Sequence, residues 1–168
     1  MPEIEASHAE MKSKATQREV VVVLDNIRSG LNVGNIFRSS DAFGVRKIYC
    51  CGYTATPPHR EVLKSALGSS ETVPWEHHLD AVQLLQTLTE QGFECIAIEQ
   101  TAKSQLLGSW QPMGEKIAVI FGNEVDGVSQ ALIDGSHTAI ELPQVGMKHS
   151  INVSVCAGIV LYDVLFNR

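Results

Sequence analysis

The stretch of sequence that decides the fold covers residues 140–167 and reads IELPQVGMKHSINVSVCAGIVLYDVLFN. It begins as a short apolar strand that ends at Pro143, continues through a loop containing Gly146, and then changes to apolar residues spaced three and four apart. That spacing predicts a helix with one apolar face, and we expect Ser150 to be its N-cap and Asn152 to lie inside its first turn. A strand, a glycine-containing loop and the free amides of a helix can together bind a ligand. The same pattern also fits an ordinary strand–loop–helix connection.

The length and composition indicate one soluble domain. The chain has 168 residues, which is enough for a substantial core, and its 44% hydrophobic and 19% charged residues are ordinary for a soluble protein. The longest apolar runs, residues 20–24 and 117–121, have the length of strands and are too short to cross a bilayer. The first 19 residues lack the apolar core of a signal peptide, so we expect a cytoplasmic protein without membrane association.

The cysteines support the same interpretation. Cys50, Cys51, Cys95 and Cys156 all lie in apolar segments, and none has the spacing of a metal site. We therefore expect buried free thiols in a reducing cytoplasm and no metal cofactor. Cys50 and Cys51 are adjacent in a predicted strand, so their side chains should point to opposite faces of the sheet.

The net charge of −6 argues against a protein dominated by affinity for nucleic acid, because phosphate binding requires lysine and arginine. It does not exclude a local basic patch, and most candidate residues fall in the first 64 positions. The candidates are Lys12, Lys14, Arg18, Arg28, Arg38, Arg46, Lys47, Arg60, Lys64 and Lys148.

Predicted strands alternate with predicted helices along the chain, at the spacing of βαβ units. The expected strands are residues 20–24, 47–51, 72–75 at an edge, 94–99, 117–121 and 137–142. The expected helices are residues 31–43, 59–67, 79–90, 129–133 and a final one that begins directly after Ser150, with 103–114 irregular. Residues 20–168 are thus predicted to form an α/β domain, an open, mostly parallel sheet with helices on both faces. Residues 1–19 are predicted to be a flexible or loosely docked extension, with helical tendency over residues 6–17.

Three predicted strand ends carry unusual polar residues, and ligands of parallel α/β sheets bind outside the carboxyl ends of strands. The first segment, NVGNIFR, contains Asn32 and Arg38; the second is Gly122-Asn123-Glu124; the third is Ser150-Ile151-Asn152. Neither the Walker motif nor G-x-G-x-x-G is present, so neither common nucleotide fingerprint applies.

Each of these residues also has an ordinary structural interpretation. Arg38 can pair with Asp41 on its own helix, Asn32 can be an N-cap, and Glu124 can be a solvated loop carboxylate. Their coincidence at three strand ends favours a binding or catalytic site. His149 is interpreted as a solvent-facing loop residue, although it precedes Ser150 and has the chemistry of a base.

Three segments, in this order, resemble the motifs of a known family. LDNIRSGLNVGNIFRSSDAFGV is similar to the first motif of the SpoU (TrmH-like) RNA ribose methyltransferases of the SPOUT superfamily. IAVIFGNEVDGVS resembles the second motif, and IELPQVGMKHSINVSVCAGIVLYDVL resembles the third. The resemblance covers residues 20–165, which is nearly the whole chain.

The resemblance implies a sheet whose C-terminal segment forms a deep trefoil knot. The knot would bind S-adenosylmethionine in a bent conformation through the loops around Gly122, Leu142 and Ile151, with Gln100 as a further contact. It also implies a homodimer in which both chains build each active site. The expected reaction is methyl transfer to a ribose 2′-oxygen of RNA, with tRNA preferred over rRNA as the substrate.

The family's catalytic arginine corresponds to Arg38 and its motif asparagine to Asn32. Glu124, Ser150 and Asn152 match the remaining catalytic positions without departure. Because a guanidinium is rarely deprotonated, we expect Arg38 to bind the phosphate and stabilise the developing alkoxide. Relatives often carry an RNA-binding domain or long basic terminal helices, and this N-terminus is short and of mixed charge. A non-catalytic RNA-binding module and a small-molecule methyltransferase are the alternative functions.

Overall fold

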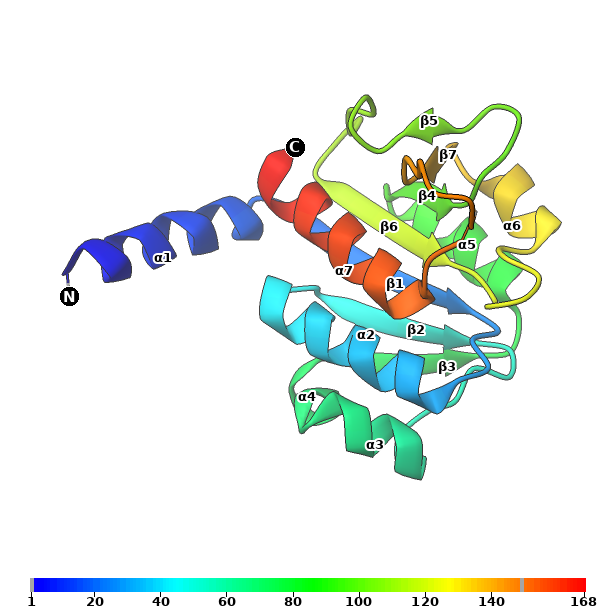
Figure 1. Ribbon diagram of the computed structural model, residues 1–168, viewed down its shortest axis with the longest axis horizontal. Helices are drawn as coiled ribbons and strands as arrows, with labels where there is room; N and C mark the ends of the chain where they lie inside the picture. The colour runs from blue at the N-terminus through cyan, green and yellow to red at the C-terminus, as the bar shows by residue number, and fades with distance from the viewer. Residues whose placement is uncertain (1, 149) are drawn as a thin grey trace.

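Seven parallel strands form the centre of the molecule, in the spatial order β3-β2-β1-β6-β4-β7-β5 (Figure 1). The computed structural model describes residues 2–148 and 150–168. The strands are β1 (Glu19–Asp25), β2 (Lys47–Cys51), β3 (Trp75–His78), β4 (Glu94–Ile98), β5 (Gln105–Leu106), β6 (Lys116–Phe121) and β7 (Thr138–Glu141). The central pair β1 and β6 consists of continuous apolar runs, as expected for parallel strands buried on both faces. The predicted α/β class with a parallel sheet is confirmed.

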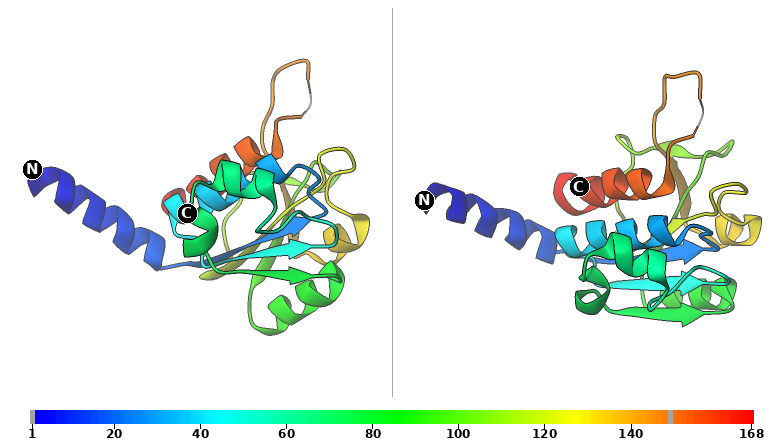
Figure 2. Two further views of the ribbon diagram at one scale, coloured as in Figure 1. Left: turned by 90° about the horizontal axis from the view of Figure 1, so that it is seen from below. Right: turned by 60° about the horizontal axis from the view of Figure 1, so that its bottom comes forward.

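Helices cover both faces of this sheet (Figure 2). They are α1 (Pro2–Thr16), α2 (Gly30–Phe43), α3 (Arg60–Ala66), α4 (Ser69–Thr72), α5 (Ala81–Glu90), α6 (Gln130–Gly135), α7 (Val153–Tyr162) and the π-helical turn η1 (Asp163–Asn167). Helices α2, α3, α4 and α7 pack on one face, and α5 and α6 pack on the other. The long loops that follow β1, β6 and β7 therefore meet at the carboxyl edge of the sheet.

The two faces bury alternate residues of the same strands, because successive side chains of a strand point in opposite directions. Val20 and Val22 of β1 pack under α2 and α7, whereas Val21 packs with α5 and α6 on the opposite face. Cys50 and Cys51 divide in the same way, as their adjacent positions predicted, and all four cysteines are free thiols.

Helix α2 begins and ends at residues that suit helix termini. The Ser29 hydroxyl accepts a hydrogen bond from the backbone amide of Asn32, and Gly44 adopts the left-handed conformation at the C-cap. The N-cap is thus Ser29, and Asn32 lies in the first turn. Within α2, Gly34 touches α3 so closely that a Cβ atom there would lie 2.4 Å from the carbonyl oxygen of Val62. A side chain at this position would push α3 away from α2.

Two predicted boundaries were wrong. The edge strand begins at Trp75 and not at residue 72, because Ser69–Thr72 forms the short helix α4 and Pro74 has no amide for the ladder. The irregular stretch 103–114 contains the two-residue strand β5, which pairs with β7 at the other edge of the sheet. Both errors lie at sheet edges, where the sequence pattern is weakest.

The prediction that Ser150 caps the final helix was also wrong. Asn152 has non-helical backbone angles and its Oδ1 accepts a hydrogen bond from the amide of Ser154, so Asn152 is the N-cap of α7. Serine and asparagine cap helices about equally well, so the cap residue itself did not decide this start. The amide group of Asn152 has a second partner, Asn32 of α2, which fixes the helix at this residue.

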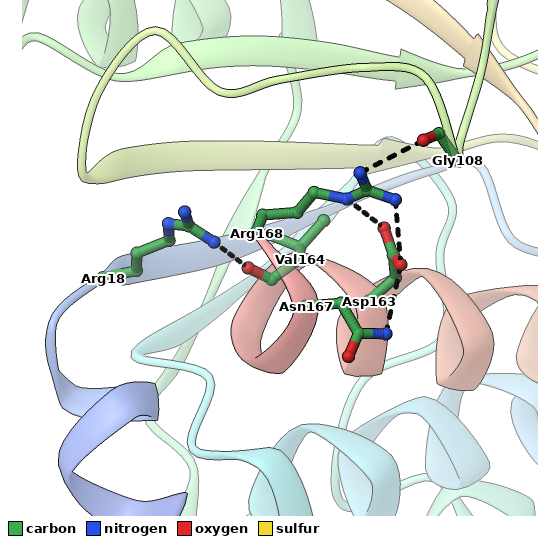
Figure 3. Close-up of polar contacts among 6 residues, drawn as sticks. All are labelled: Arg18, Gly108, Asp163, Val164, Asn167 and Arg168. Atoms are coloured by element: carbon green, nitrogen blue, oxygen red, sulfur yellow. Dashed lines mark hydrogen bonds and ion pairs between the residues drawn. The ribbon is translucent and has the colours of Figure 1, made fainter.

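The C-terminal turn is joined to two distant parts of the chain (Figure 3). The Arg168 guanidinium donates hydrogen bonds of 2.7 and 3.1 Å to the two carboxylate oxygens of Asp163, and a third of 3.2 Å to the carbonyl oxygen of Gly108. The Arg18 guanidinium donates to the carbonyl oxygen of Val164. Only 10% of the Arg168 side chain and 14% of the Asp163 side chain are exposed, so solvent screens this ion pair little.

Helix α1 projects from the body of the molecule, and its described side chains from Ile4 to Lys14 are exposed (Figure 1). The expected helical stretch is therefore present and begins earlier, at Pro2. The predicted looseness of this extension stays a prediction. None of the described helices has the length and apolar character needed to cross a bilayer.

Candidate active site

A cavity of about 470 Å³ opens at the carboxyl edge of the sheet, outside the ends of β4, β6 and β7. Its volume lies in the ordinary range for small-molecule sites. Its walls include all four residues that the resemblance assigns to cofactor binding, namely Gln100, Gly122, Leu142 and Ile151. A larger groove of about 900 Å³ lies at the opposite edge, between α1, α2 and the C-terminal turn, and it contains none of the predicted site residues.

Three of the predicted catalytic residues form a continuous chain of hydrogen bonds at this cavity. The Asn152 Nδ2 donates to Asn32 Oδ1 over 3.1 Å, and the Asn32 Nδ2 donates to Glu124 Oε1 over 2.9 Å. The Asn32 side chain is buried, with 8% exposed. Residues separated by 92 and 120 positions in the chain are thereby held in contact. The segments that follow β1, β6 and β7 contribute one residue each, Asn32 from the first turn of α2, as their strand-end positions predicted.

The Glu124 carboxylate docks the loop after β6 onto the start of α2. It accepts hydrogen bonds from the backbone amides of Arg28 (2.9 Å) and Ser29 (3.0 Å), in addition to the bond from Asn32. Partial burial alone would raise the pKa of Glu124, but these hydrogen bonds outweigh it and lower the pKa below its ordinary value. Glu124 is therefore ionised and holds the loop after β6 against the start of α2, and it is a poor general base. The interpretation as a merely solvated carboxylate is wrong.

Further polar residues hold the same loops together; Asn123 belongs to the second strand-end segment, whereas Asp25 and Glu99 were not singled out from the sequence. Asp25 Oδ2 accepts a hydrogen bond from the amide of Ser129, and Glu99 Oε2 accepts one from the amide of Val128. Asn123 donates to the backbone oxygen of Asn26 over 2.7 Å. These hydrogen bonds join the loops to one another at the carboxyl ends of the strands. Their positions directly after apolar runs were the available signal.

Gly122 is the position where the cavity wall leaves no room for a side chain. A Cβ atom there would lie 2.1 Å from the backbone nitrogen of Val128 and 2.5 Å from the carbonyl oxygen of Gly127. The loop after β6 therefore folds back on itself at a glycine, with its backbone facing the cavity. Any larger residue would displace the turn that carries Glu124.

The structure does not join Arg38 and Ser150 to this hydrogen-bonded chain. Arg38 is exposed on α2, and its side chain has no hydrogen bond or ion pair with the described part of the chain. The alternative pairing with Asp41 is not formed, since Asp41 instead accepts a hydrogen bond from Thr72. Ser150 is exposed at the cavity wall. His149 lies outside the described residues.

Among residues 2–148 and 150–168, no group of three or more His, Cys, Asp or Glu side chains is placed to hold a metal ion. Cys156 lines the cavity, but burial and then the neighbouring charge of Glu99 raise the pKa of its thiol to about 11. A thiol with such a pKa stays protonated near neutrality and is a weak nucleophile. The polar groups that remain at the site are suited to orienting a substrate by hydrogen bonds.

A parallel α/β sheet with a cavity and a polar cluster at the carboxyl ends of its strands defines a domain that binds a small ligand there. Residues 19–162 match the model of the SpoU rRNA Methylase family, and the chain belongs to this family. The resemblance seen in the three motifs is therefore confirmed.

The relatives include enzymes named for different RNAs. The chain is 30% identical over 149 residues to a 23S rRNA (guanosine-2'-O-)-methyltransferase RlmB of Neisseria meningitidis, with 89% of this chain and 59% of that protein covered. An AdoMet-bound rRNA methyltransferase of Sinorhizobium meliloti superposes with a TM-score of 0.81 at 25% identity, over 87% of this chain and 55% of that one. The A. aeolicus TrmH/SpoU tRNA modifying enzyme gives 0.79 at 26% identity, over 94% and 82%. The chain thus spans less than two thirds of the RlmB protein's length.

Proposed function

We propose that the protein transfers a methyl group from S-adenosylmethionine to a ribose 2′-oxygen of RNA. The observation that carries this proposal is that Glu124 and Asn152 line the cavity, and that both are hydrogen-bonded to Asn32 of α2. A bound donor and a bound ribose would thus lie beside each other. Membership of the SpoU family supports the same reaction.

The residues that line the cavity fit S-adenosylmethionine. Leu142 and Ile151 offer apolar side chains, while the turn at Gly122 and the segment around Gln100 offer backbone and amide groups. The donor supplies an electrophilic methyl group on a sulfonium. These residues would bind its adenosine part and keep water away from the sulfonium.

The catalytic roles follow from the side-chain chemistry. In the transfer, the bond from the ribose oxygen to the methyl carbon forms as the carbon–sulfur bond breaks, and the hydroxyl proton passes to water or a substrate phosphate. Arg38 is free of partners among the described residues, so its guanidinium is available to bind the phosphate and stabilise the alkoxide. Asn32 and Asn152 would orient the ribose, Ser150 would bind it at the cavity wall, and Glu124 would keep the loops in place.

We propose tRNA as the substrate and rRNA as the alternative. The match with the A. aeolicus tRNA modifying enzyme extends over 82% of that chain, while the matches with rRNA methyltransferases extend over 59% and 55% of theirs. This difference supports testing tRNA first. The RlmB relative is named for 23S rRNA, so rRNA is to be tested as the alternative substrate.

We also propose that two copies of the chain form a dimer through α7. Val155 (54% exposed), Ile159 (45%) and Tyr162 (49%) lie three and four positions apart on α7 and form one uncovered apolar stripe. Val155→Glu is expected to give a monomer in size-exclusion chromatography with light scattering. Val82→Glu, on α5 with 38% exposed, is the matched control and should not change the mass. A Val155→Glu variant with the mass of the wild type would contradict this interface.

The deep trefoil knot is proposed for this chain as well. The hydrogen bond from Arg168 to the carbonyl oxygen of Gly108 supports it, because it places the C-terminal turn against the segment between β5 and β6. Threading of the chain in a crystal structure would test it.

The reaction is tested with donor labelled in the methyl group and unmodified transcripts of tRNA and rRNA. We expect label in RNA, recovered as a 2′-O-methylnucleoside after digestion, and about 100-fold less or lower still with Arg38→Ala. Transfer to small molecules alone, with binding that does not depend on salt, would instead support a small-molecule methyltransferase. Binding of RNA without transfer from any transcript would support a non-catalytic module.

A further inference from the structure

An exposed tyrosine lies at the rim of the candidate active site, and both its hydroxyl group and its backbone amide are hydrogen-bonded. Tyr53 follows β2, and 62% of it is exposed. Its hydroxyl accepts a hydrogen bond of 2.8 Å from Asn123 Nδ2, and its backbone amide donates one of 3.0 Å to Asn26 Oδ1. Single exposed aromatic residues are common on protein surfaces. A ring that is open to solvent and fixed at both ends is preorganised to bind a partner.

The groups that hold Tyr53 also build the candidate active site. Asn123 Oδ1 accepts hydrogen bonds from the amides of Val125 (2.8 Å) and Asp126 (3.0 Å), so the same side chain shapes the turn that contains Glu124. Its amide group reaches both Tyr53 and the backbone oxygen of Asn26. The ring is thus held by the same side chain that shapes this turn.

The backbone beside the ring is arranged to permit this contact. Asn26 adopts a left-handed conformation, with φ of 54°. A Cβ atom at Gly52 would lie 1.9 Å from Asn26 Oδ1. The position before Tyr53 is therefore restricted to glycine. Conformations of this kind are held by surrounding contacts and are concentrated at functional sites.

Two arginines lie on the segments around the ring: Arg28 follows Asn26, which binds the backbone amide of Tyr53, by two residues, and Arg60 begins α3 seven residues after Tyr53. The backbone amide of Arg28 is held by Glu124, and its side chain is exposed. The start of α3 touches the start of α2, since a Cβ atom at Gly30 would lie 2.9 Å from the His59 ring, and Arg60 follows directly. Neither arginine forms an ion pair within the described residues. The nearby acid Glu61 is exposed and likewise outside those pairs.

We propose that Tyr53 is a stacking platform for an unpaired base next to the methylated nucleotide, and that Arg28 and Arg60 contact the flanking phosphates. This inference rests on the proposed function and adds the kind of RNA structure that is bound. Bases displaced from a helix stack on aromatic side chains, and this mode of recognition is typical of single-stranded loops. A paired nucleotide would have no face available for Tyr53. The enzyme is therefore expected to select ribose in an unpaired segment.

The test measures binding of two RNAs, a mixed-sequence single-stranded oligonucleotide and a fully paired duplex, to protein saturated with S-adenosylhomocysteine. Wild type should prefer the single strand. Tyr53→Ala should weaken single-strand binding by about 5- to 150-fold, the range for one stacked base, and remove the preference. Tyr53→Phe keeps the ring and should retain the preference. Arg28→Ala and Arg60→Ala should each reduce the salt slope of single-strand binding by about 0.7.

Met113→Ala is the control, because Met113 is 70% exposed on the loop before β6, outside both the cavity and this rim. Binding of S-adenosylhomocysteine to Tyr53→Ala is measured by calorimetry. An affinity unchanged from wild type shows that the donor site is intact. Wild-type single-strand affinity in Tyr53→Ala, alongside methyl transfer by the wild type, would overturn the stacking inference alone. An equal loss for single strand and duplex would overturn it too. Tyr53-dependent binding without transfer to any RNA would overturn the proposed reaction and leave the stacking site supported.

Discussion

The hydrogen bond between Asn32 and Glu124 is the contact whose disruption gives the most specific prediction. Asn32→Asp keeps the size of the side chain but replaces the donating amide, 2.9 Å from Glu124 Oε1, with a carboxylate oxygen. The change removes one hydrogen bond and places two negative groups in contact. The bond from Asn152 to residue 32 is retained, because it is accepted by an oxygen in both cases.

The expected cost can be worked out from these contacts. Two unit charges about 4 Å apart repel by about 1 kcal/mol in bulk water and about 4 kcal/mol at an effective dielectric constant of about 20. The lost hydrogen bond adds about 0.5–1.5 kcal/mol. Because Asn32 is buried but Glu124 is exposed, solvent screens the pair in part, and we expect a total of about 2–3 kcal/mol. At about 2–4 °C per kcal/mol for a domain of this size, the melting temperature should fall by about 4–12 °C.

The pH dependence of this loss has a definite sign. Two adjacent carboxylates raise the pKa of one of them, since both cannot remain charged without repulsion. The folded variant then binds more protons than the unfolded variant, so its deficit relative to wild type should shrink as the pH falls from about 7.5 to about 5. The assay is thermal unfolding followed by circular dichroism across this range.

Asn35→Asp is the matched control, because Asn35 is exposed on the same helix and the substitution adds the same charge. It should unfold within about 2 °C of the wild type at every pH, as expected for a surface change. If Asn32→Asp and Asn35→Asp unfolded at the same temperature throughout, the contact between α2 and the loop after β6 would be refuted.

Three further predictions concern Arg38, the pKa of Glu124 and the ion pair between Asp163 and Arg168. Arg38→Ala and Arg38→Lys should lower methyl transfer by about 100-fold or more while leaving the melting temperature and donor binding unchanged, because Arg38 has no partner in the described part of the chain and is proposed to bind only the RNA; full turnover in both would remove its role. The lowered pKa of Glu124 means that its stabilisation is complete above the ordinary carboxyl range and is lost as the pH falls through the lowered pKa. The melting temperatures of wild type and Glu124→Gln should therefore converge in acid, and a constant gap would contradict this linkage. Asp163→Ala should cost about 3 kcal/mol in urea unfolding by leaving Arg168 without its carboxylate, with donor affinity preserved, and unchanged stability would argue against the ion pair.

Most elements of this fold were predictable from local patterns, and the short α4 and β5 at the sheet edges were not. The β-branched run of β1 and the alternation that separates Cys50 from Cys51 follow from the geometry of a strand. The order of the strands was not predictable in this way, because nothing in the apolar runs shows that β6 inserts between β1 and β4. Pairing between distant strands depends on the whole chain.

The candidate site shows the same division. Asn32, Glu124 and Asn152 were identified from strand-end positions and from the family motifs, and the structure joins them. The capping role fell to Asn152 and not to Ser150, because a contact 120 residues away fixed the start of the helix. Tyr53 carried no pattern that distinguishes it from any exposed tyrosine; its significance comes from hydrogen bonds made in the folded chain.

The most direct test of the central claim is a map of 2′-O-methylated nucleotides in tRNA and rRNA from cells with and without the gene for this protein. We predict that one ribose methylation is lost without the gene, returns with the wild-type gene, and does not return with Arg38→Ala. An identical set of ribose methylations in both kinds of cell, or full restoration by Arg38→Ala, would contradict it.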